Sequence, residues 1–167
     1  MDAADGLLLL SNQLFAMDLD TMSLKYRINA PVSVGQFLHV LHQSGLASRR
    51  PVNDLECLKG MLQNSNLIIT AWDQDELIGI ARSMTDFHHA CYLSDLAVSQ
   101  AYQGLSVGFN LQVLTQQQLG EHCKLILLSA PNSNEYYPKL GYQAHDRCWV
   151  LSRDEVLSKR AYSNAMS

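Results

Sequence analysis

A stretch near the middle of the chain has the residue types and spacing that bind a phosphate group. The apolar run 92–98 reads as a strand, and after four further residues come Gln103-Gly104-Leu105-Ser106-Val107-Gly108 and a helical pattern. A helix that begins directly after a small-residue loop leaves its first backbone N–H groups without partners in the helix, beside the positive end of its dipole. The stretch therefore predicts a phosphate-binding loop, with an ordinary strand-to-helix turn as the alternative.

Side chains around this stretch are candidates for proton transfer. Asp95 lies inside the apolar strand, where a carboxylate is costly unless it is paired or functional. It could accept a proton through water, hold a cationic substrate, or pair with a structural partner such as Arg82. His88 and His89 precede the strand and titrate near neutral pH, but adjacent strand residues face opposite ways, so at most one would face the site. A solvated turn is the other interpretation of this pair.

The spacing of apolar residues predicts the order β-α-α-β-β-β-α-β-α-β. The second and third strands are joined by an acidic turn and should form an antiparallel hairpin, to which the fourth strand adds. A polar hinge, Ser48-Arg49-Arg50-Pro51, separates the first two helices. The predicted strands are 23–28, 67–72, 77–82, 90–98, 124–130 and 142–152, and the predicted helices begin near Pro31 or Ser33, Asn53 or Asp54, Gln103 and Asn132.

Composition and charge limit the class of protein. The chain has 167 residues, of which 47% are hydrophobic and 17% charged, which predicts one compact domain, and no apolar run approaches the ~20 residues of a membrane span. A net charge of −4 argues against nucleic-acid binding. All of this charge falls on four aspartates in residues 1–21. We expect an acidic and apolar extension at 1–21, a domain at 22–153 and a polar tail at 154–167.

The cysteines and histidines predict neither disulfides nor a metal site. The four cysteines form no C-x-x-C pair and are expected to be reduced thiols. His39 and His42 have no acid or cysteine beside them in sequence and are expected on a helix surface. The acidic start is unlike a secretory signal, so the predicted location is cytoplasmic.

The loop resembles motif A of the GNAT superfamily of N-acetyltransferases, Gln/Arg-x-x-Gly-x-Gly/Ala. Gln103, Val107 and Gly108 fit this motif, and Ser106 stands where its first glycine belongs. Serine keeps the backbone N–H that a phosphate needs, but its Cβ restricts a positive φ. No Lys or Arg occurs between Arg82 and Lys124. We therefore hypothesise that backbone amides and the helix dipole bind the pyrophosphate, with a shallow dependence on salt.

A second segment resembles motif B of the same family, Asn-x-x-x-Phe-Tyr-x-x-x-Gly-Phe. Asn132, Tyr137 and Gly141 have the matching spacing, about twenty residues after motif A. The resemblance covers about residues 22–152. It implies a GNAT-like α+β fold of three layers, in which a mixed, mostly antiparallel sheet flanked by helices splays between its fourth and fifth strands to admit the pantetheine arm of acetyl-CoA.

The resemblance also implies the residues that act on acetyl-CoA. Backbone groups at the strand end would hold the arm and offer an amide to the thioester carbonyl, the loop would cradle the pyrophosphate, and Asn132 would bind the arm unless it is a helix N-cap. Tyr137 stands at the position of the general acid, with a core aromatic as the alternative and Tyr136 as the neighbour in question. The implied cofactor contacts are Leu96, Ala97, Val98, Gln103, Gly104, Leu105, Ser106, Val107, Gly108, Phe109 and Asn132; Asp95 is the candidate base.

The function expected from this resemblance is transfer of an acetyl group from acetyl-CoA to a primary amine of a small molecule, by direct attack in a ternary complex. The alternatives are a CoA-binding regulatory or partner-binding domain, an interaction protein that does not bind CoA, and acetylation of a protein or peptide amine. No metal, nucleic-acid partner or membrane is expected. The apolar residues among 2–21 suggest packing on a partner subunit, so a homodimer is a further hypothesis.

Overall fold

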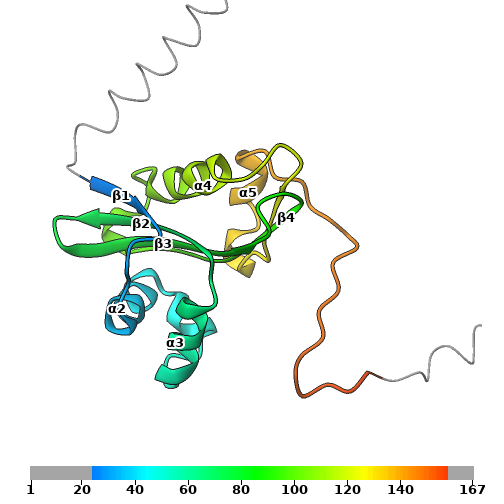
Figure 1. Cartoon of the computed structure of the whole chain (residues 1–167), viewed down its shortest axis with the longest axis horizontal. Coiled ribbons are helices and arrows are strands. Elements are labelled where there is room, and N and C mark those ends of the chain that lie inside the picture. Colours follow the sequence, from blue (N-terminus) through cyan, green and yellow to red (C-terminus); the bar gives the residue numbers. More distant parts are fainter. Residues whose placement is uncertain (1–23, 158–167) are drawn as a thin grey trace, which may run out of the picture. The chain divides into compact units, whose positions relative to one another are not determined.

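The computed structural model describes residues 24–157, which fall into one compact unit ending at Leu128 and another beginning at Ser129. The first unit is built on a five-stranded sheet in the order β1-β2-β3-β4-β5, in which β1 to β4 are antiparallel and β5 runs parallel to β4 (Figure 1). This arrangement confirms the predicted mixed, mostly antiparallel sheet. The strands are β1 (Leu24–Ile28), β2 (Leu67–Asp73), β3 (Glu76–Thr85), β4 (Ala90–Val98) and β5 (Lys124–Ile126).

Helices cover both faces of this sheet. On one face lie α2 (Val34–Ser44) and α3 (Leu55–Gln63), joined by the short 3-10 helix η1 (Leu46–Arg49), and on the other lies α4 (Val107–Gln117) (Figure 1). Side chains of β2 alternate between the two resulting cores and are nearly all buried, which is why its sequence is mostly apolar.

Local capping fixes the first two helices where the sequence predicts them. Ser33 and Gln36 form a capping box at the start of α2, and Gly45 ends that helix at φ +81°, a conformation that favours glycine. Of the two residues predicted to start the second helix, Asp54 is the cap, since its side chain accepts a hydrogen bond from the Cys57 amide.

Two glycines bring α4 close to the sheet. A Cβ on Gly79 of β3 would lie 3.2 Å from side-chain atoms of both Val107 and Leu111, so the missing side chain lets the helix approach the strand. After the helix ends, the Gly120 amide donates a 2.8 Å hydrogen bond to the Phe87 carbonyl in the β3–β4 turn. The helix is therefore held close to β3 near its start and tied to the β3–β4 turn just after its end.

The second unit, described over residues 129–157, contains little regular structure. It holds the 3-10 helix η3 (Pro131–Ser133) and one turn of helix, α5 (Tyr136–Lys139). The predicted helix 132–140 is therefore wrong in extent, since this stretch holds only part of η3 and the single turn of α5. The expected strand at 124–130 is also shorter than predicted, because β5 pairs with β4 over three residues only.

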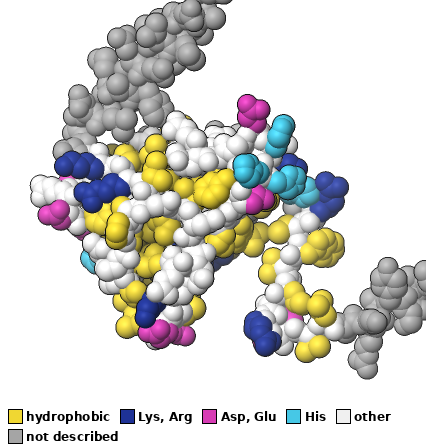
Figure 2. Space-filling model, in the orientation of Figure 1, with side chains coloured by type: hydrophobic (Ala, Val, Ile, Leu, Met, Phe, Trp, Pro, Cys, Tyr) yellow, Lys and Arg dark blue, Asp and Glu magenta, His cyan; other side chains and the backbone are white. Residues whose placement is uncertain are grey.

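The predicted strand 142–152 is wrong. Its residues pair with no other strand in the described part of the chain, and apolar alternation without a hydrogen-bonded neighbour does not make a strand. Trp149 is 90% exposed and Val150 71% exposed, and Figure 2 shows hydrophobic side chains along this extended segment.

Some predictions fall on residues that the structure does not describe. The extension 1–21, with its suggested role in dimer formation, lies outside the described residues, as does most of the tail 154–167. Within residues 24–157, no helix combines the length and the hydropathy needed to cross a bilayer.

Candidate active site

The edge of β4 that faces away from β3 is open over its second half. β5 pairs only with Ala90–Tyr92, so no described strand pairs with this edge beyond Tyr92. The Ser99 amide donates a 2.8 Å hydrogen bond to Ile78 of β3, and backbone groups alternate along a strand. The backbone groups of Ala97 therefore point to β3, whereas those of Leu96 and Val98 point to the open edge.

The loop that follows β4 turns sharply at two residues. After the 3-10 helix η2 (Gln100–Tyr102), Gly104 has φ +78° and Ser106 has φ +61°, both in the left-handed region. Glycine adopts this conformation freely, whereas serine is strained there. The Gln103 side chain closes the loop onto the strand with a 2.9 Å hydrogen bond from its Nε2 to the Val98 carbonyl. This bond occupies one of the polar groups at the open edge.

The start of α4 is uncapped. Ser106 occupies the N-cap position, and its side chain makes no capping hydrogen bond. The first bond of the helix runs from the Asn110 amide to the Ser106 carbonyl at 2.9 Å, so the amides of Val107, Gly108 and Phe109 find no acceptor among the described residues. Three free N–H groups at the positive end of a helix form a seat for an anion such as a phosphate.

The loop is anchored by a polar contact rather than by a basic residue. The Tyr102 hydroxyl donates a 2.6 Å hydrogen bond to the carboxylate of Asp73, the last residue of β2, and this bond raises the pKa of Tyr102 above its ordinary value. Leu105 and Phe109, on either side of the helix start, are 48% and 39% exposed. Apolar side chains therefore border the free amides of Val107, Gly108 and Phe109.

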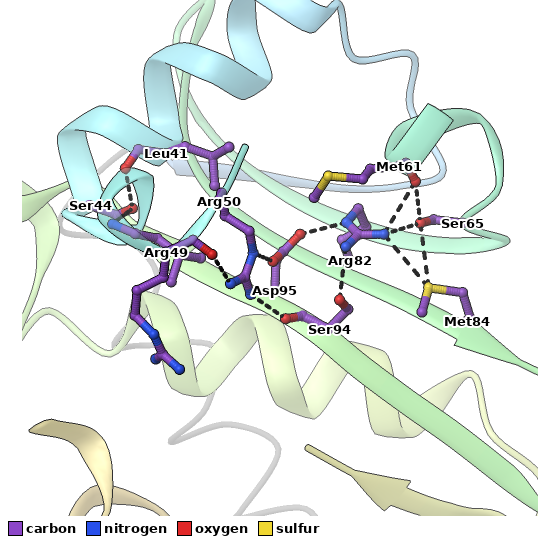
Figure 3. A network of polar contacts seen from close by, with 11 residues as sticks. Leu41, Ser44, Arg49, Arg50, Met61, Ser65, Arg82, Met84, Ser94 and Asp95 are labelled. Atoms are coloured by element: carbon purple, nitrogen blue, oxygen red, sulfur yellow. Dashed lines mark hydrogen bonds and ion pairs between the residues drawn. The ribbon is translucent and has the colours of Figure 1, made fainter. Parts of the chain in front are cut away.

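Asp95 lies between two arginines (Figure 3). Its Oδ1 accepts a 2.5 Å hydrogen bond from Nε of Arg50, and its Oδ2 accepts one of the same length from Nε of Arg82. The Asp95 side chain has no exposed surface, and that of Arg82 is 5% exposed. Several roles were considered for Asp95, and the structure contains one of them, the ion pair with Arg82.

Arg50 is the partner that sequence reasoning missed. It follows η1 in the polar hinge, 45 residues before Asp95, and its side chain is 21% exposed. The sequence holds two separate signals for this pair: a carboxylate on an apolar strand, which needs a partner, and two adjacent arginines in the hinge. Nothing in the spacing indicates that the hinge packs against β4.

The turn before β4 is solvated, as the second interpretation of His88 and His89 predicted. Both side chains are exposed, and the Asp86 carboxylate accepts hydrogen bonds from the amides of His89, Ala90 and His88 at 2.7, 3.0 and 2.9 Å. These bonds, led by the one from His89, lower the pKa of Asp86 to about 2. His39 and His42 are exposed on α2, as expected.

The second unit holds the candidate general acid. The Tyr137 ring makes edge-to-face contacts with Tyr136 and Tyr142, with centroid distances of 5.3 and 5.4 Å. Burial raises the pKa of the Tyr137 phenol above its ordinary value, so this hydroxyl keeps its proton at neutral pH. Asn132 lies in η3, and its side chain is outside the described part of the structure.

Comparison with known proteins decides the family. The model of the acetyltransferase (GNAT) domain matches residues 40–149. The chain belongs to the GNAT acetyltransferase family. Membership implies an acyltransferase fold, and enzymes of this family use acetyl-CoA. The expected GNAT-like fold and family are both confirmed.

Solved GNAT structures share this fold at low sequence identity. A probable acetyltransferase from methicillin-resistant Staphylococcus aureus has a TM-score of 0.62 and 19% identity over 80% of this chain and 99% of its own. An aminoglycoside N-acetyltransferase in complex with CoA has a TM-score of 0.60 and 14% identity over 78% and 95% of the two chains. An aminoglycoside acetyltransferase from an uncultured soil metagenomic sample, in complex with sisomicin, has a TM-score of 0.55 and 17% identity over 80% and 99%. No curated protein sequence matches this chain.

Proposed function

We propose that this GNAT protein transfers the acetyl group of acetyl-CoA to a primary amine of a small molecule, by direct attack within a ternary complex. The observation that carries the proposal is the uncapped start of α4, reached from the open edge of β4 through the strained loop 103–106. A pyrophosphate needs free N–H donors, and the pantetheine arm needs unpaired backbone groups on a strand edge. The first unit offers both, one directly after the other.

The residues present fit acetyl-CoA. The amides of Val107, Gly108 and Phe109 would hold the pyrophosphate, and the backbone groups of Leu96 with the amide of Val98 would hold the arm, since the Val98 carbonyl is bound by Gln103. Ala97 is a weaker candidate for such a contact than the sequence suggested, since its backbone groups point to β3. When bound, acetyl-CoA supplies an activated thioester that a neutral amine attacks directly.

The chain's own groups would then manage charge and protons. An outward amide at Leu96 or Val98 would donate a hydrogen bond to the thioester carbonyl oxygen, where negative charge develops. The Tyr137 phenol, which the resemblance to motif B suggests as the general acid, would protonate the departing sulfur, and its raised pKa means that it holds this proton at neutral pH. The amine nitrogen gives up its own proton as the new C–N bond forms.

The base that takes this proton is not Asp95 in our proposal. A general base must reach the proton it abstracts, directly or through one water. Asp95 has no exposed surface and both of its oxygens bind guanidinium groups. We propose that this carboxylate is structural and that the amine loses its proton to water.

One experiment separates the enzyme from a CoA-binding module. Thiol release from acetyl-CoA would be followed over a panel of small primary amines, with Tyr137→Phe as the test variant and Tyr136→Phe as its matched control. We expect turnover with at least one amine, a loss of about 10²-fold or more in kcat for Tyr137→Phe, and a small effect of Tyr136→Phe. Equal losses in the two variants would contradict the assignment of the acid.

The second candidate function is a CoA-binding domain that does not catalyse transfer. The strained Ser106 in the loop and the engagement of Asp95 by two arginines favour it. A rise in melting temperature with CoA, without turnover of any amine, would support this candidate, since a ligand that binds only the native state stabilises it. Failure of acetyl-CoA to shift the melting temperature would contradict both candidates.

A further inference from the structure

β4 contains a bulge at Ser94. Arg82 of β3 pairs with Asp95, and the next residue of β3, Ser83, pairs with Leu93, so Ser94 is an additional residue on its strand. Before the bulge, Cys91 and Leu93 pack in the core under α4.

The side chains change faces at this point. Beyond the bulge, Ala97 packs in the opposite core, under α2, while Leu96 and Val98 pack toward α4. A shift of one residue exchanges the two faces of a strand, and the bulge makes that exchange here. It carries Asp95 to the face where Arg50 and Arg82 lie (Figure 3).

The backbone groups change direction at the same point. Before the bulge, the Ala90 carbonyl accepts a hydrogen bond from the Asp86 amide, so even-numbered residues point to β3. Beyond the bulge, Ser99 donates to Ile78, so odd-numbered residues point to β3. An unbulged strand would leave Asp95 and Ala97, rather than Leu96 and Val98, at the open edge.

Two guanidinium groups hold Ser94 by both of its polar oxygens. Nη2 of Arg50 donates a 2.8 Å hydrogen bond to the Ser94 carbonyl, and Nη2 of Arg82 donates one of 2.8 Å to its hydroxyl. Asp95 fixes the orientation of both groups through their Nε atoms, and Arg82 also binds Ser65 Oγ at 2.7 Å. A planar guanidinium that donates in several fixed directions is well suited to such a clamp.

We propose that Arg50 and Arg82 are positioning residues that keep the bulge at Ser94 and thereby aim the backbone groups of Leu96 and Val98 at the pantetheine arm. The inference rests on the proposed function for its catalytic consequence, whereas the clamp itself is a property of the free protein. Both arginines act through Ser94, and neither needs to touch a substrate.

The test compares two serines that bind the same guanidinium from different sides. Ser94→Ala removes the hydrogen bond between Arg82 and the bulge. The control Ser65→Ala removes the one between Arg82 and Ser65, just after α3, and leaves the bond from Arg82 to the Met61 carbonyl. Each variant deletes one hydroxyl and leaves the pairing with Asp95 intact, so both should fold. Arg50→Lys is a second test variant, because a lysine cannot bind Asp95 and the Ser94 carbonyl with the same fork.

Two readouts are taken from the full-length protein. Native-state hydrogen exchange reports the amides of Asp95 and Ala97, which face β3 just beyond the bulge, and steady-state kinetics report KM for acetyl-CoA. We expect Ser94→Ala and Arg50→Lys to speed exchange at these two amides and to raise KM by about tenfold, the effect of losing a hydrogen bond to a charged group. Ser65→Ala should leave KM unchanged. Its exchange rates at the two amides should also match wild type after correction for any difference in the global free energy of unfolding.

The outcomes separate the clamp from the proposed function. Equal exchange in Ser94→Ala and Ser65→Ala would overturn the clamp. Faster exchange with an unchanged KM would overturn its role in acetyl-CoA binding. If the wild-type protein neither binds CoA nor acetylates any amine, the proposed function fails, and the exchange comparison still decides whether the arginines hold the bulge.

Discussion

Replacing Ser106 by glycine should stabilise the folded chain. The loop holds this residue at φ +61°, a region that costs an L-amino acid about 1–2 kcal/mol, and a glycine would remove that strain. Glycine in turn loses about 0.5–1 kcal/mol more conformational entropy on folding. The Ser106 side chain makes no capping hydrogen bond, so no contact is lost. The difference is a gain of about 0.5–1 kcal/mol in the free energy of unfolding.

Urea unfolding followed by circular dichroism would measure this gain as a higher midpoint at an unchanged slope. Ser106→Ala is the matched control, because it removes the hydroxyl and keeps the strained Cβ, and it should not stabilise. Gly104→Ala should have the opposite sign, since it puts a Cβ at φ +78°. If Ser106→Gly is no more stable than Ser106→Ala, the loop does not store strain at this residue and the reasoning fails.

Three further predictions follow from the charges. Asp95→Asn should lower the free energy of unfolding by about 3–5 kcal/mol, because it leaves two guanidinium groups without their shared carboxylate; a variant with wild-type stability and no activity would instead make Asp95 the base. The pKa of Asp86 lies below its ordinary value, so its contribution to stability is complete above about pH 4 and is lost as the pH falls toward 2; melting temperatures over this range should fall less for Asp86→Asn than for wild type. CoA affinity should depend only weakly on salt, since no Lys or Arg lies between Arg82 and Lys124, and a steep dependence in calorimetry would show that cations elsewhere in the chain bind the phosphates.

The sequence predicts those elements whose signals are local. The helix start near Ser33, the cap at Asp54 and the acidic β2–β3 turn each depend on a few adjacent residues, and all three are found in the structure. The loop between β4 and α4, which we propose binds phosphate, also has a local signal, since a strand, a glycine and a helix start lie within about fifteen residues.

The rest depends on contacts between distant segments. Arg50 and Asp95 are 45 residues apart, and no periodicity links them. The bulge at Ser94 cannot be read from apolar spacing, because alternating burial continues through β4 although the face changes. The segment 142–152 has the composition of a strand and lacks a partner within the described residues, which shows that propensity alone does not create pairing.

Because of the additional residue at Ser94, the faces on which the β4 side chains lie depend on the number of residues in the strand more than on which residues they are. Deletion of Ser94 would restore regular pairing with β3, and every later side chain of β4 would then move to the opposite face of the sheet. A carboxylate would enter the apolar layer beneath α4, and the two arginines would face leucine. We therefore expect natural and engineered variants of this strand to exchange residues readily at its exposed positions and to conserve its residue count without exception.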